Sequence, residues 1–341
     1  MLHLFLQFIK YYYPERVPIM QELRLLGHSN LSFSPLGLGT WQFSNKDKGR
    51  TWWRKIDDQT VYDIIKVSLD GGINWLDTAE VYGRGNSEKF IGRNLQRLGS
   101  KEALGSRVYI ADKWFPLLRS ADTIPETIKT RLDYLQRDSI DLYQIHQPTS
   151  LSSLYRQLRE LAKLHEMGFI NAIGVSNFTA RQMEKADDIL QRFGLRLSSN
   201  QVKYNLLHRK PEKNGVLELA KERGISIIAY SPLQQGVLTG RFHDNPESIQ
   251  EISKVRRMNS GLSQRNLIRT QPLIDLLKRL GLKYGKSPAQ ISLNWLIRAH
   301  GETVFAIPGA SSRFQARSNL EAQCFELSQA DIEQLNHWEE L

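Results

Sequence analysis

The chain has 341 residues, of which 40% are hydrophobic and 24% charged, and its formal net charge is +10. This composition is typical of a globular protein and excludes extensive disorder. The single cysteine, Cys324, excludes an intrachain disulfide framework and a multi-cysteine zinc site. It fits a reducing compartment, and we expect a cytoplasmic protein.

Neither a nucleic acid nor a membrane is predicted as a partner. The positive net charge favours anionic ligands. However, the densest cationic cluster, Lys254–Arg257, is short and lacks the interleaved aromatic residues of a nucleic-acid groove. No stretch approaches the ~20 apolar residues of a membrane-spanning helix. The apolar start, Met1–Ile9, lacks a basic leader and a small-residue cleavage site, so no signal peptide is expected.

Short strand-like runs alternate along the chain with longer segments of helical periodicity. The runs begin near Pro35, Asn74, Val108, Ile140, Ile170, Ser199, Ile225 and Thr303. Most of them lie about 30 residues apart, which is the length of one βαβ unit. Several are apolar without interruption, as expected of strands that are buried on both faces of a parallel sheet.

The segments between these runs carry apolar residues at helical spacing. The clearest pattern is a set of four leucines over 154–164, spaced by three or four residues, and shorter patterns occupy 61–69 and 216–220. Asn177 or Thr179 is a candidate N-cap for the helix that follows the fifth strand-like run.

Eight strands that alternate with helices predict a closed (β/α)8 TIM barrel, an α/β fold. An open doubly wound sheet is the alternative, but no strand is followed by the GxGxxG that its dinucleotide fingerprint requires. The last two strands begin 78 residues apart, so we predict a long loop after strand seven, over Gln235–Gln271. Loops of this length are usually either functional or disordered. Met20 precedes the first regular pattern. We therefore predict an N-terminal extension over residues 1–19 and a single barrel domain over residues 20–341.

Chemically active side chains follow three neighbouring strands of this barrel. Asp77 and Tyr82 follow the second strand, Lys113 ends the third and His146 ends the fourth. Because reactive groups of such barrels lie at the carboxyl ends of the strands, we expect these side chains to converge. A lysine cation lowers the pKa of a nearby tyrosine, an aspartate holds the lysine, and a neutral histidine donates to a substrate oxygen. The set predicts a site that donates a proton to a carbonyl group.

Several motifs, in order, resemble the aldo-keto reductase family from about Leu23 to the C-terminus. They are Leu26–Thr40, similar to the family's N-terminal β-hairpin and first strand, Asp77–Gly83 with Ser87–Glu88, Asp141–His146, Gly174–Phe178 and Asn200–Asn205. The subgroup that the chain resembles contains bacterial and plant general reductases and potassium-channel β subunits. The resemblance implies that Asp77, Tyr82, Lys113 and His146 are the catalytic tetrad, with Tyr82 as the acid.

The resemblance also implies that the cofactor is NADPH, bound without a Rossmann fold. The implied contacts are Ser176, Asn177 and Gln201 for the carboxamide, Tyr230 for the nicotinamide ring, Ser231, Pro232, Leu233, Gln235, Gly236 and Arg241 for the pyrophosphate, and Gly309, Ser311, Arg313, Gln315 and Asn319 for the adenosine and its 2′-phosphate. Many relatives carry lysine in place of Gly309, arginine in place of Gln315 and an acidic residue in place of Ser318. We expect Arg313 and Arg317 to compensate for the lost charge.

The implied reaction is the NADPH-dependent reduction of a small aldehyde or ketone to an alcohol. Four aromatic residues that follow strands one and three, Trp41, Phe43, Trp114 and Phe115, are predicted to line the substrate pocket. The eight histidines show no metal-ligand spacing, so no metal is expected.

Two other functions remain open from the sequence. One is a redox-sensing regulatory subunit that binds NADPH with negligible turnover, because the channel β subunits keep the same tetrad. Turnover of a generic aldehyde distinguishes it from a reductase. The other is a barrel lyase that uses Lys113 in a Schiff base, which borohydride trapping would reveal. Asp77 beside the lysine argues against the neutral amine that this chemistry needs.

Overall fold

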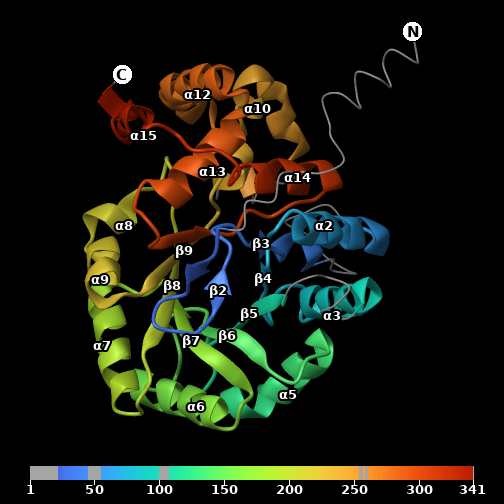
Figure 1. The fold of residues 1–341 in the computed structure, drawn as a ribbon, viewed down its shortest axis with the longest axis vertical. Helices are drawn as coiled ribbons and strands as arrows, with labels where there is room; N and C mark the ends of the chain where they lie inside the picture. The colour runs from blue at the N-terminus through green and yellow to red at the C-terminus, as the bar shows by residue number, and fades with distance from the viewer. Residues whose placement is uncertain (1–21, 45–54, 100–106, 253–255, 258–259, 341) are drawn as a thin grey trace.

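Eight parallel strands form the centre of the computed structural model, which describes residues 22–44, 55–99, 107–252, 256–257 and 260–340 (Figure 1). The strands are β3 (Leu38–Gly39), β4 (Trp75–Asp77), β5 (Tyr109–Trp114), β6 (Ile140–Ile145), β7 (Ile170–Ser176), β8 (Leu197–Lys203), β9 (Ser226–Tyr230) and β10 (Val304–Ala306). They pair in chain order. The bridges Leu36–Ala306 and Gly39–Gly309 join the first strand region to the last. The sheet is therefore closed, which confirms the (β/α)8 barrel and excludes the open sheet.

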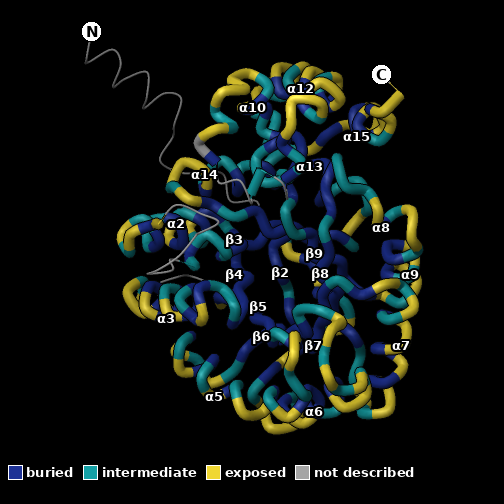
Figure 2. The backbone as a smooth tube through the Cα atoms, turned by 180° about the vertical axis from the view of Figure 1, so that it is seen from behind, coloured by how far each residue is buried: buried dark blue, intermediate teal, exposed yellow. Residues whose placement is uncertain are grey.

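Helices surround the barrel. The longer ones are α2 (Asp58–Asp70), α3 (Asn86–Leu98), α5 (Thr123–Leu135), α6 (Leu154–Glu166), α7 (Ala180–Gln191), α9 (Val216–Arg223), α12 (Gln264–Tyr284), α13 (Pro288–Arg298), α14 (Arg313–Glu321) and α15 (Gln329–Asn336). The shorter ones are η1 (Trp41–Ser44), α8 (Lys210–Lys213), η2 (Gln234–Thr239), α10 (Arg241–Asp244), η3 (Pro246–Glu251) and η4 (Trp338–Glu340). The strands are buried, and exposed residues gather on the outer faces of the helices (Figure 2). The three predicted helical patterns lie in α2, α6 and α9.

Thr179 is the N-cap of α7. Its hydroxyl accepts a hydrogen bond from the Gln182 backbone N–H, and the Gln182 side chain accepts one from the Thr179 N–H, which makes a capping box. Asn177, the other candidate, has a left-handed backbone with φ of 62° and does not cap the helix. The Asn177 side chain instead makes hydrogen bonds at the carboxyl end of the barrel.

An antiparallel hairpin closes the amino-terminal end of the barrel. In it, β1 (Arg24–Leu25) pairs with β2 (Ser32–Phe33). Phe33 stacks on Trp75 of β4 with ring centroids 4.7 Å apart, and both side chains are fully buried. Gly37 permits this packing, because a Cβ atom there would lie 2.3 Å from the Trp75 ring. The hairpin is as predicted, whereas the predicted extension, residues 1–19, lies outside the described residues.

The long segment after β9 contains more helix than predicted. It passes through η2, α10 and η3, and then α12 begins at Gln264, so positions 264–271 are helical and not loop. The helix begins there because the Ser263 hydroxyl accepts a hydrogen bond from the Asn266 N–H, while Leu267 and Thr270 turn into the core.

Candidate active site

The four predicted catalytic residues come together at the carboxyl end of the barrel. Asp77 is the last residue of β4, Lys113 lies near the end of β5, and His146 directly follows β6. Tyr82 lies in the turn that leads from β4 to α3. The three strands are neighbours in the sheet, and this adjacency brings residues distant in sequence to one edge.

A buried ion pair forms the base of the site. The Lys113 Nζ donates to Asp77 Oδ1 at 2.5 Å and to the Thr78 carbonyl at 2.6 Å. Gln201 of β8 donates from Nε2 to the other Asp77 oxygen at 2.7 Å. Lys113 is 0% exposed and Asp77 is 1% exposed. The pair is therefore shielded from water and fixed by hydrogen bonds on both partners.

Lys113 is held in its charged form. Burial by itself lowers its pKa, but the Asp77 carboxylate and Tyr82 more than offset this effect, so the pKa lies above its ordinary value. A nucleophilic amine must be neutral to attack a carbonyl group. The geometry therefore argues against Schiff-base chemistry and leaves Lys113 as a fixed cation.

The Tyr82 ring lies above this cation, with the Lys113 Nζ 5.2 Å from the ring centroid. Burial raises the pKa of the Tyr82 phenol, the Lys113 cation opposes the rise, and the Asp77 carboxylate adds to it. The net pKa is above the ordinary value, whereas the sequence predicted a lowered one. The difference arises because burial outweighs the cation, and it keeps the phenol protonated at neutral pH.

His146 completes the group as a neutral imidazole. Its ring meets the Tyr82 ring edge to face, with centroids 6.0 Å apart. Burial and, to a lesser extent, the Lys113 charge lower the pKa of His146 to about 3. The Nδ1 atom is buried and has no hydrogen-bond partner in the described part of the chain. A neutral imidazole has one N–H, so His146 can donate a hydrogen bond without carrying charge.

Of the four aromatic residues predicted to line the pocket, two lie beside the tetrad. Trp41 stacks on Tyr82 with centroids 6.2 Å apart, and Phe115 lies 5.6 Å from His146. The other two, Phe43 and Trp114, are 0% exposed and belong to the hydrophobic core, which corrects their predicted place. On β5 successive side chains point to opposite sides, so Lys113 points into the barrel and Trp114 points away from it.

The residues predicted near the carboxamide form a chain of hydrogen bonds beside His146. The Tyr230 hydroxyl donates to Asn177 Oδ1 at 3.0 Å, and Asn177 Nδ2 donates to the Ser176 hydroxyl at 3.0 Å and to the His146 carbonyl at 3.3 Å. The Ser176 hydroxyl donates to the Gln201 carbonyl at 2.9 Å. These polar groups are thus already oriented toward one another on β7, β8 and β9.

The segment after β9 turns through several left-handed residues. Positive φ angles occur at Ser231 (51°), Gln234 (46°), Gln235 (54°) and Gly236 (98°). The Gln234 and Gly236 N–H groups donate to the Ser231 and Leu233 carbonyls, so the turn is held by its own hydrogen bonds. Pro232 and Leu233 continue the same turn.

Arg256 is a residue that sequence reasoning missed. It donates from Nη2 to the Gln235 carbonyl at 3.0 Å. Burial, and to a lesser extent the charge of Arg241, lowers its pKa to about 10. Two guanidinium groups that repel each other beside this backbone turn favour an anionic ligand. The sequence signal for it is the cationic cluster Lys254–Arg257.

Of the predicted adenosine residues, Gly309 and Ser311 precede α14, Arg313 and Gln315 lie in its first turn, and Asn319 lies near its end. The Gln315 Oε1 accepts from the N–H and hydroxyl of Ser311, at 2.8 and 2.9 Å. Asn319 Nδ2 donates to the Gly309 carbonyl at 3.2 Å. Arg313 is exposed, and Arg317 faces Glu321 with 3.5 Å between Nε and Oε1. Gly309 contacts the Gln42 amide so closely that a Cβ atom would lie 2.1 Å from Nε2, so this position accepts no side chain in this arrangement.

Two further properties bear on the class of the protein. Within the described part of the chain, no group of three or more His, Cys, Asp or Glu side chains is arranged to hold a metal ion. None of the helices described combines the length and apolar character that crossing a bilayer requires.

Comparisons with known proteins agree with this geometry. The profile of the aldo/keto reductase family matches residues 35–340. An uncharacterised oxidoreductase of Mycobacterium tuberculosis is 35% identical over 300 residues, which is 86% of each chain. The NADH-specific methylglyoxal reductase of Escherichia coli is 29% identical over 323 residues, 90% of this chain and 94% of the relative. The solved aldo-keto reductase of Klebsiella pneumoniae in complex with NADPH shares the fold, with a TM-score of 0.69 at 24% identity over 92% of this chain and 93% of its own.

Proposed function

This chain belongs to the aldo/keto reductase family, and on that premise we propose that it reduces a small aldehyde or ketone to an alcohol with NADPH as reductant. The observation that carries the proposal is the buried Lys113–Asp77 pair beneath a protonated Tyr82, with neutral His146 beside it. This arrangement supplies a proton donor and a hydrogen-bond donor to one oxygen atom. A redox-sensing subunit that keeps the same tetrad is distinguished from a reductase by turnover.

Tyr82 is the proton donor in this mechanism. When bound, the nicotinamide supplies the hydride that reduces the carbonyl carbon. As negative charge develops on the carbonyl oxygen, Tyr82 transfers its phenolic proton to it. The Lys113 cation stabilises the phenolate that remains, because an opposite charge nearby favours the ionised form. Asp77 keeps that cation in position.

His146 orients the carbonyl group. Its low pKa means that it does not compete with Tyr82 as the acid at neutral pH. It donates a hydrogen bond to the carbonyl oxygen and polarises the group before reduction. Trp41 packs on Tyr82 and Phe115 packs on His146, and apolar rings beside these two groups strengthen their hydrogen bonds to a substrate.

The structure fits a dinucleotide cofactor. The hydrogen bonds of Asn177 to Ser176 and to the His146 carbonyl support a role of these polar groups in binding the carboxamide. The family resemblance supports stacking of Tyr230 on the nicotinamide ring. The Gln201 amide donates a hydrogen bond to Asp77. A hydrogen bond from Gln201 to the carboxamide would be made in addition to this one. The left-handed turn at 231–236, with Arg241 and Arg256, fits the pyrophosphate. Ser311, Gln315 and Arg313 at the start of α14 favour the 2′-phosphate, hence NADPH over NADH.

The direct test follows cofactor absorbance during reduction of 4-nitrobenzaldehyde, with NADPH and NADH in separate assays. We expect turnover with both and a higher kcat/KM with NADPH. Tight cofactor binding without turnover, across a panel of aldehydes and ketones, would instead assign the chain to the redox-sensing class. A higher kcat/KM with NADH would contradict the proposed preference for NADPH and would match the NADH specificity of the Escherichia coli relative.

A further inference from the structure

Four ionisable side chains outside the tetrad are buried beside the turn that carries Tyr82. Glu80 lies in the turn between β4 and α3, Glu88 on α3, Asp112 on β5 and Arg131 on α5. Glu88 and Asp112 are 0% exposed, Glu80 is 7% exposed and Arg131 is 8% exposed. Side chains of these types are almost never buried without a partner. The mechanism above uses none of the four, so their burial calls for another role.

Arg131 connects two points of the segment that carries Tyr82. Its Nη1 donates to Glu80 Oε2 at 3.4 Å, and its Nε lies 3.1 Å from Glu88 Oε1. Glu80 precedes Tyr82 in the chain and Glu88 follows it. We call residues 78–88 the catalytic segment. One guanidinium group therefore holds this segment on both sides of the proposed acid.

The backbone of the catalytic segment needs support from its surroundings. Gly83, Arg84 and Gly85 have successive positive φ angles of 65°, 57° and 91°. A non-glycine residue in this left-handed region is strained, and such a conformation persists only where neighbouring groups fix it. Tyr134 of α5 is one such neighbour, because a Cβ atom at Gly85 would lie 2.5 Å from its ring. The Arg131 guanidinium lies over the same ring, 5.1 Å from the centroid, and so supports the segment by packing as well as by charge.

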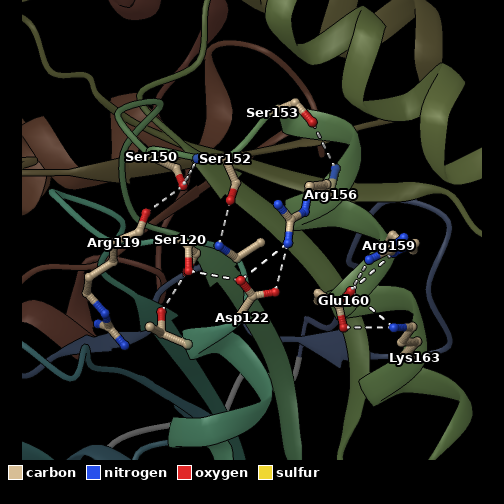
Figure 3. A network of polar contacts seen from close by, with 12 residues as sticks. Arg119, Ser120, Asp122, Ser150, Ser152, Ser153, Arg156, Arg159, Glu160 and Lys163 are labelled. Atoms are coloured by element: carbon tan, nitrogen blue, oxygen red, sulfur yellow. Dashed lines mark hydrogen bonds and ion pairs between the residues drawn. The ribbon is translucent and has the colours of Figure 1, made fainter.

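Glu80 is also fixed by the segment that follows β5. The Arg119 guanidinium and the Phe115 N–H both donate to Glu80 Oε1, the latter at 2.5 Å. The Arg119 carbonyl in turn accepts a hydrogen bond from the Ser150 hydroxyl at 2.9 Å (Figure 3). Glu80 is therefore a rigid anchor, and the contact through Arg131 extends that anchor across the catalytic segment.

Asp112 contributes to the charge balance around Arg131. Side chains alternate along β5, so Asp112 points to the opposite side from Lys113, away from the tetrad. Burial and the Asp112 carboxyl raise the pKa of Glu88 to about 10, and burial raises the pKa of Asp112 to about 6. At neutral pH Glu88 is thus uncharged and Asp112 is largely ionised. The Arg131 cation therefore faces the carboxylates of Glu80 and Asp112 and the neutral carboxyl of Glu88.

Resting on the carbonyl reduction proposed above, we propose that Arg131 is a positioning residue that keeps the Tyr82 hydroxyl in place for proton transfer. It acts through Glu80 and Glu88, and hence through the backbone of the catalytic segment. Displacing a reacting group by about 1 Å can cost about 10²-fold in rate. Loss of Arg131 should therefore slow the proton transfer, whereas binding of substrate and cofactor depends on other residues and should be preserved.

The test compares Arg131→Lys and Arg131→Met with the unmodified protein in the reduction of 4-nitrobenzaldehyde. Lysine keeps the charge but lacks the planar fork that contacts two carboxyl groups at once. We expect kcat to fall about tenfold in both variants, with KM and the dissociation constant of NADPH within about twofold. The solvent deuterium isotope effect on kcat should rise, because proton transfer from Tyr82 then limits the rate. The matched control is Lys129→Met, an exposed position on the same helix, which should change none of these values.

A further variant separates the loss of positioning from a loss of folding. Arg131→Met leaves buried carboxylates with one cation fewer, so it loses stability as well. Asp112→Asn/Arg131→Met removes one charge of each sign and should regain stability in urea, while kcat stays about tenfold low. Recovery of kcat together with stability would overturn the proposal, because Arg131 would then be part of a structural ion pair alone. A lower kcat with an unchanged isotope effect would overturn it as well.

Hydrogen–deuterium exchange separates this proposal from the proposed function, because it needs no turnover. Measured by mass spectrometry, the amides of the catalytic segment should exchange about tenfold faster in Asp112→Asn/Arg131→Met than in Lys129→Met, and those of α7 should not change. Faster exchange confined to the catalytic segment supports the role of Arg131 even if no aldehyde is reduced, a result that would overturn the reductase alone. Unchanged exchange of this segment overturns the role of Arg131, whether or not the protein is a reductase.

Discussion

Replacing Lys113 by methionine tests the electrostatic core of the mechanism. Methionine keeps most of the length of the side chain but removes a cation that lies 2.5 Å from Asp77 Oδ1 and 5.2 Å from the Tyr82 ring centroid. In the variant Asp77 remains buried, and its remaining side-chain donor is the Gln201 amide.

The expected magnitudes follow from these distances. At about 5 Å and an effective dielectric constant of about 20, a unit cation stabilises a phenolate by about 3 kcal/mol. Loss of the cation should therefore raise the pKa of Tyr82 further above its ordinary value. Leaving the Asp77 charge unpaired costs about 3–5 kcal/mol of the free energy of unfolding. The single variant should therefore lose both activity and stability.

A second variant, Asp77→Asn/Lys113→Met, separates the two losses because it removes both charges of the buried pair. We measure kcat for 4-nitrobenzaldehyde between pH 6 and 10, and the free energy of unfolding in urea. We expect a loss of ~10²-fold or more in kcat in both variants. The alkaline limb of the reduction profile should move upward or disappear, and only the double variant should regain most of its stability.

Two results would refute this reasoning. Full activity with an unchanged pH profile in Lys113→Met would make Lys113 a structural residue. Recovery of activity together with stability in the double variant would show that the single variant failed through unfolding, and not through the lost cation.

Three further predictions test other parts of the site. Tyr82→Phe should reduce turnover by ~10²-fold or more, because the acid is lost, while fluorescence titration shows unchanged NADPH binding; near-normal turnover would exclude Tyr82 as the acid. Arg313→Ala/Arg317→Ala should lower the NADPH-to-NADH affinity ratio by about tenfold or more and spare NADH; equal affinities in the unmodified protein would refute the 2′-phosphate site. Burial and the neighbouring Asp112 carboxyl raise the pKa of Glu88 to about 10, even though Arg131 lies 3.1 Å away. The stability that its proton provides is thus complete below the ordinary glutamate pKa and is lost as the pH rises toward 10. Glu88→Gln should flatten the fall in unfolding free energy between pH 6 and 9, a fall of at most about 4 kcal/mol, and an equally steep fall in the variant would contradict this assignment.

Local patterns in the sequence predicted the fold and the convergence of four chemically active side chains, both of which the structure confirms. A strand of a parallel barrel is apolar along its whole length because both of its faces are buried. The segment that connects it to the next parallel strand is an amphipathic helix with a regular apolar period. Both patterns can be recognised in short stretches of sequence. Because the carboxyl ends of parallel strands meet at one edge, the sequence also predicts that Asp77, Tyr82, Lys113 and His146 lie together. The start of α12 was predicted less well, because the cap at Ser263 lies in a polar stretch with little periodicity.

The environment of each side chain was decided by the tertiary structure. Trp114 and Phe115 are both aromatic, but the Trp114 side chain points away from the inside of the barrel and is buried in the core. The net pKa of Tyr82 depends on burial as well as on Lys113, and burial is a property of everything packed around the ring. Arg256 is near enough to Arg241 for the two charges to interact, beside the turn that contains the left-handed residues. No sequence pattern indicates that these residues are left-handed. The sequence predicts which side chains lie at the rim, because it shows which residues follow each strand. The pKa of each of these side chains depends on burial and on the charges around it, which come from residues distant in the sequence.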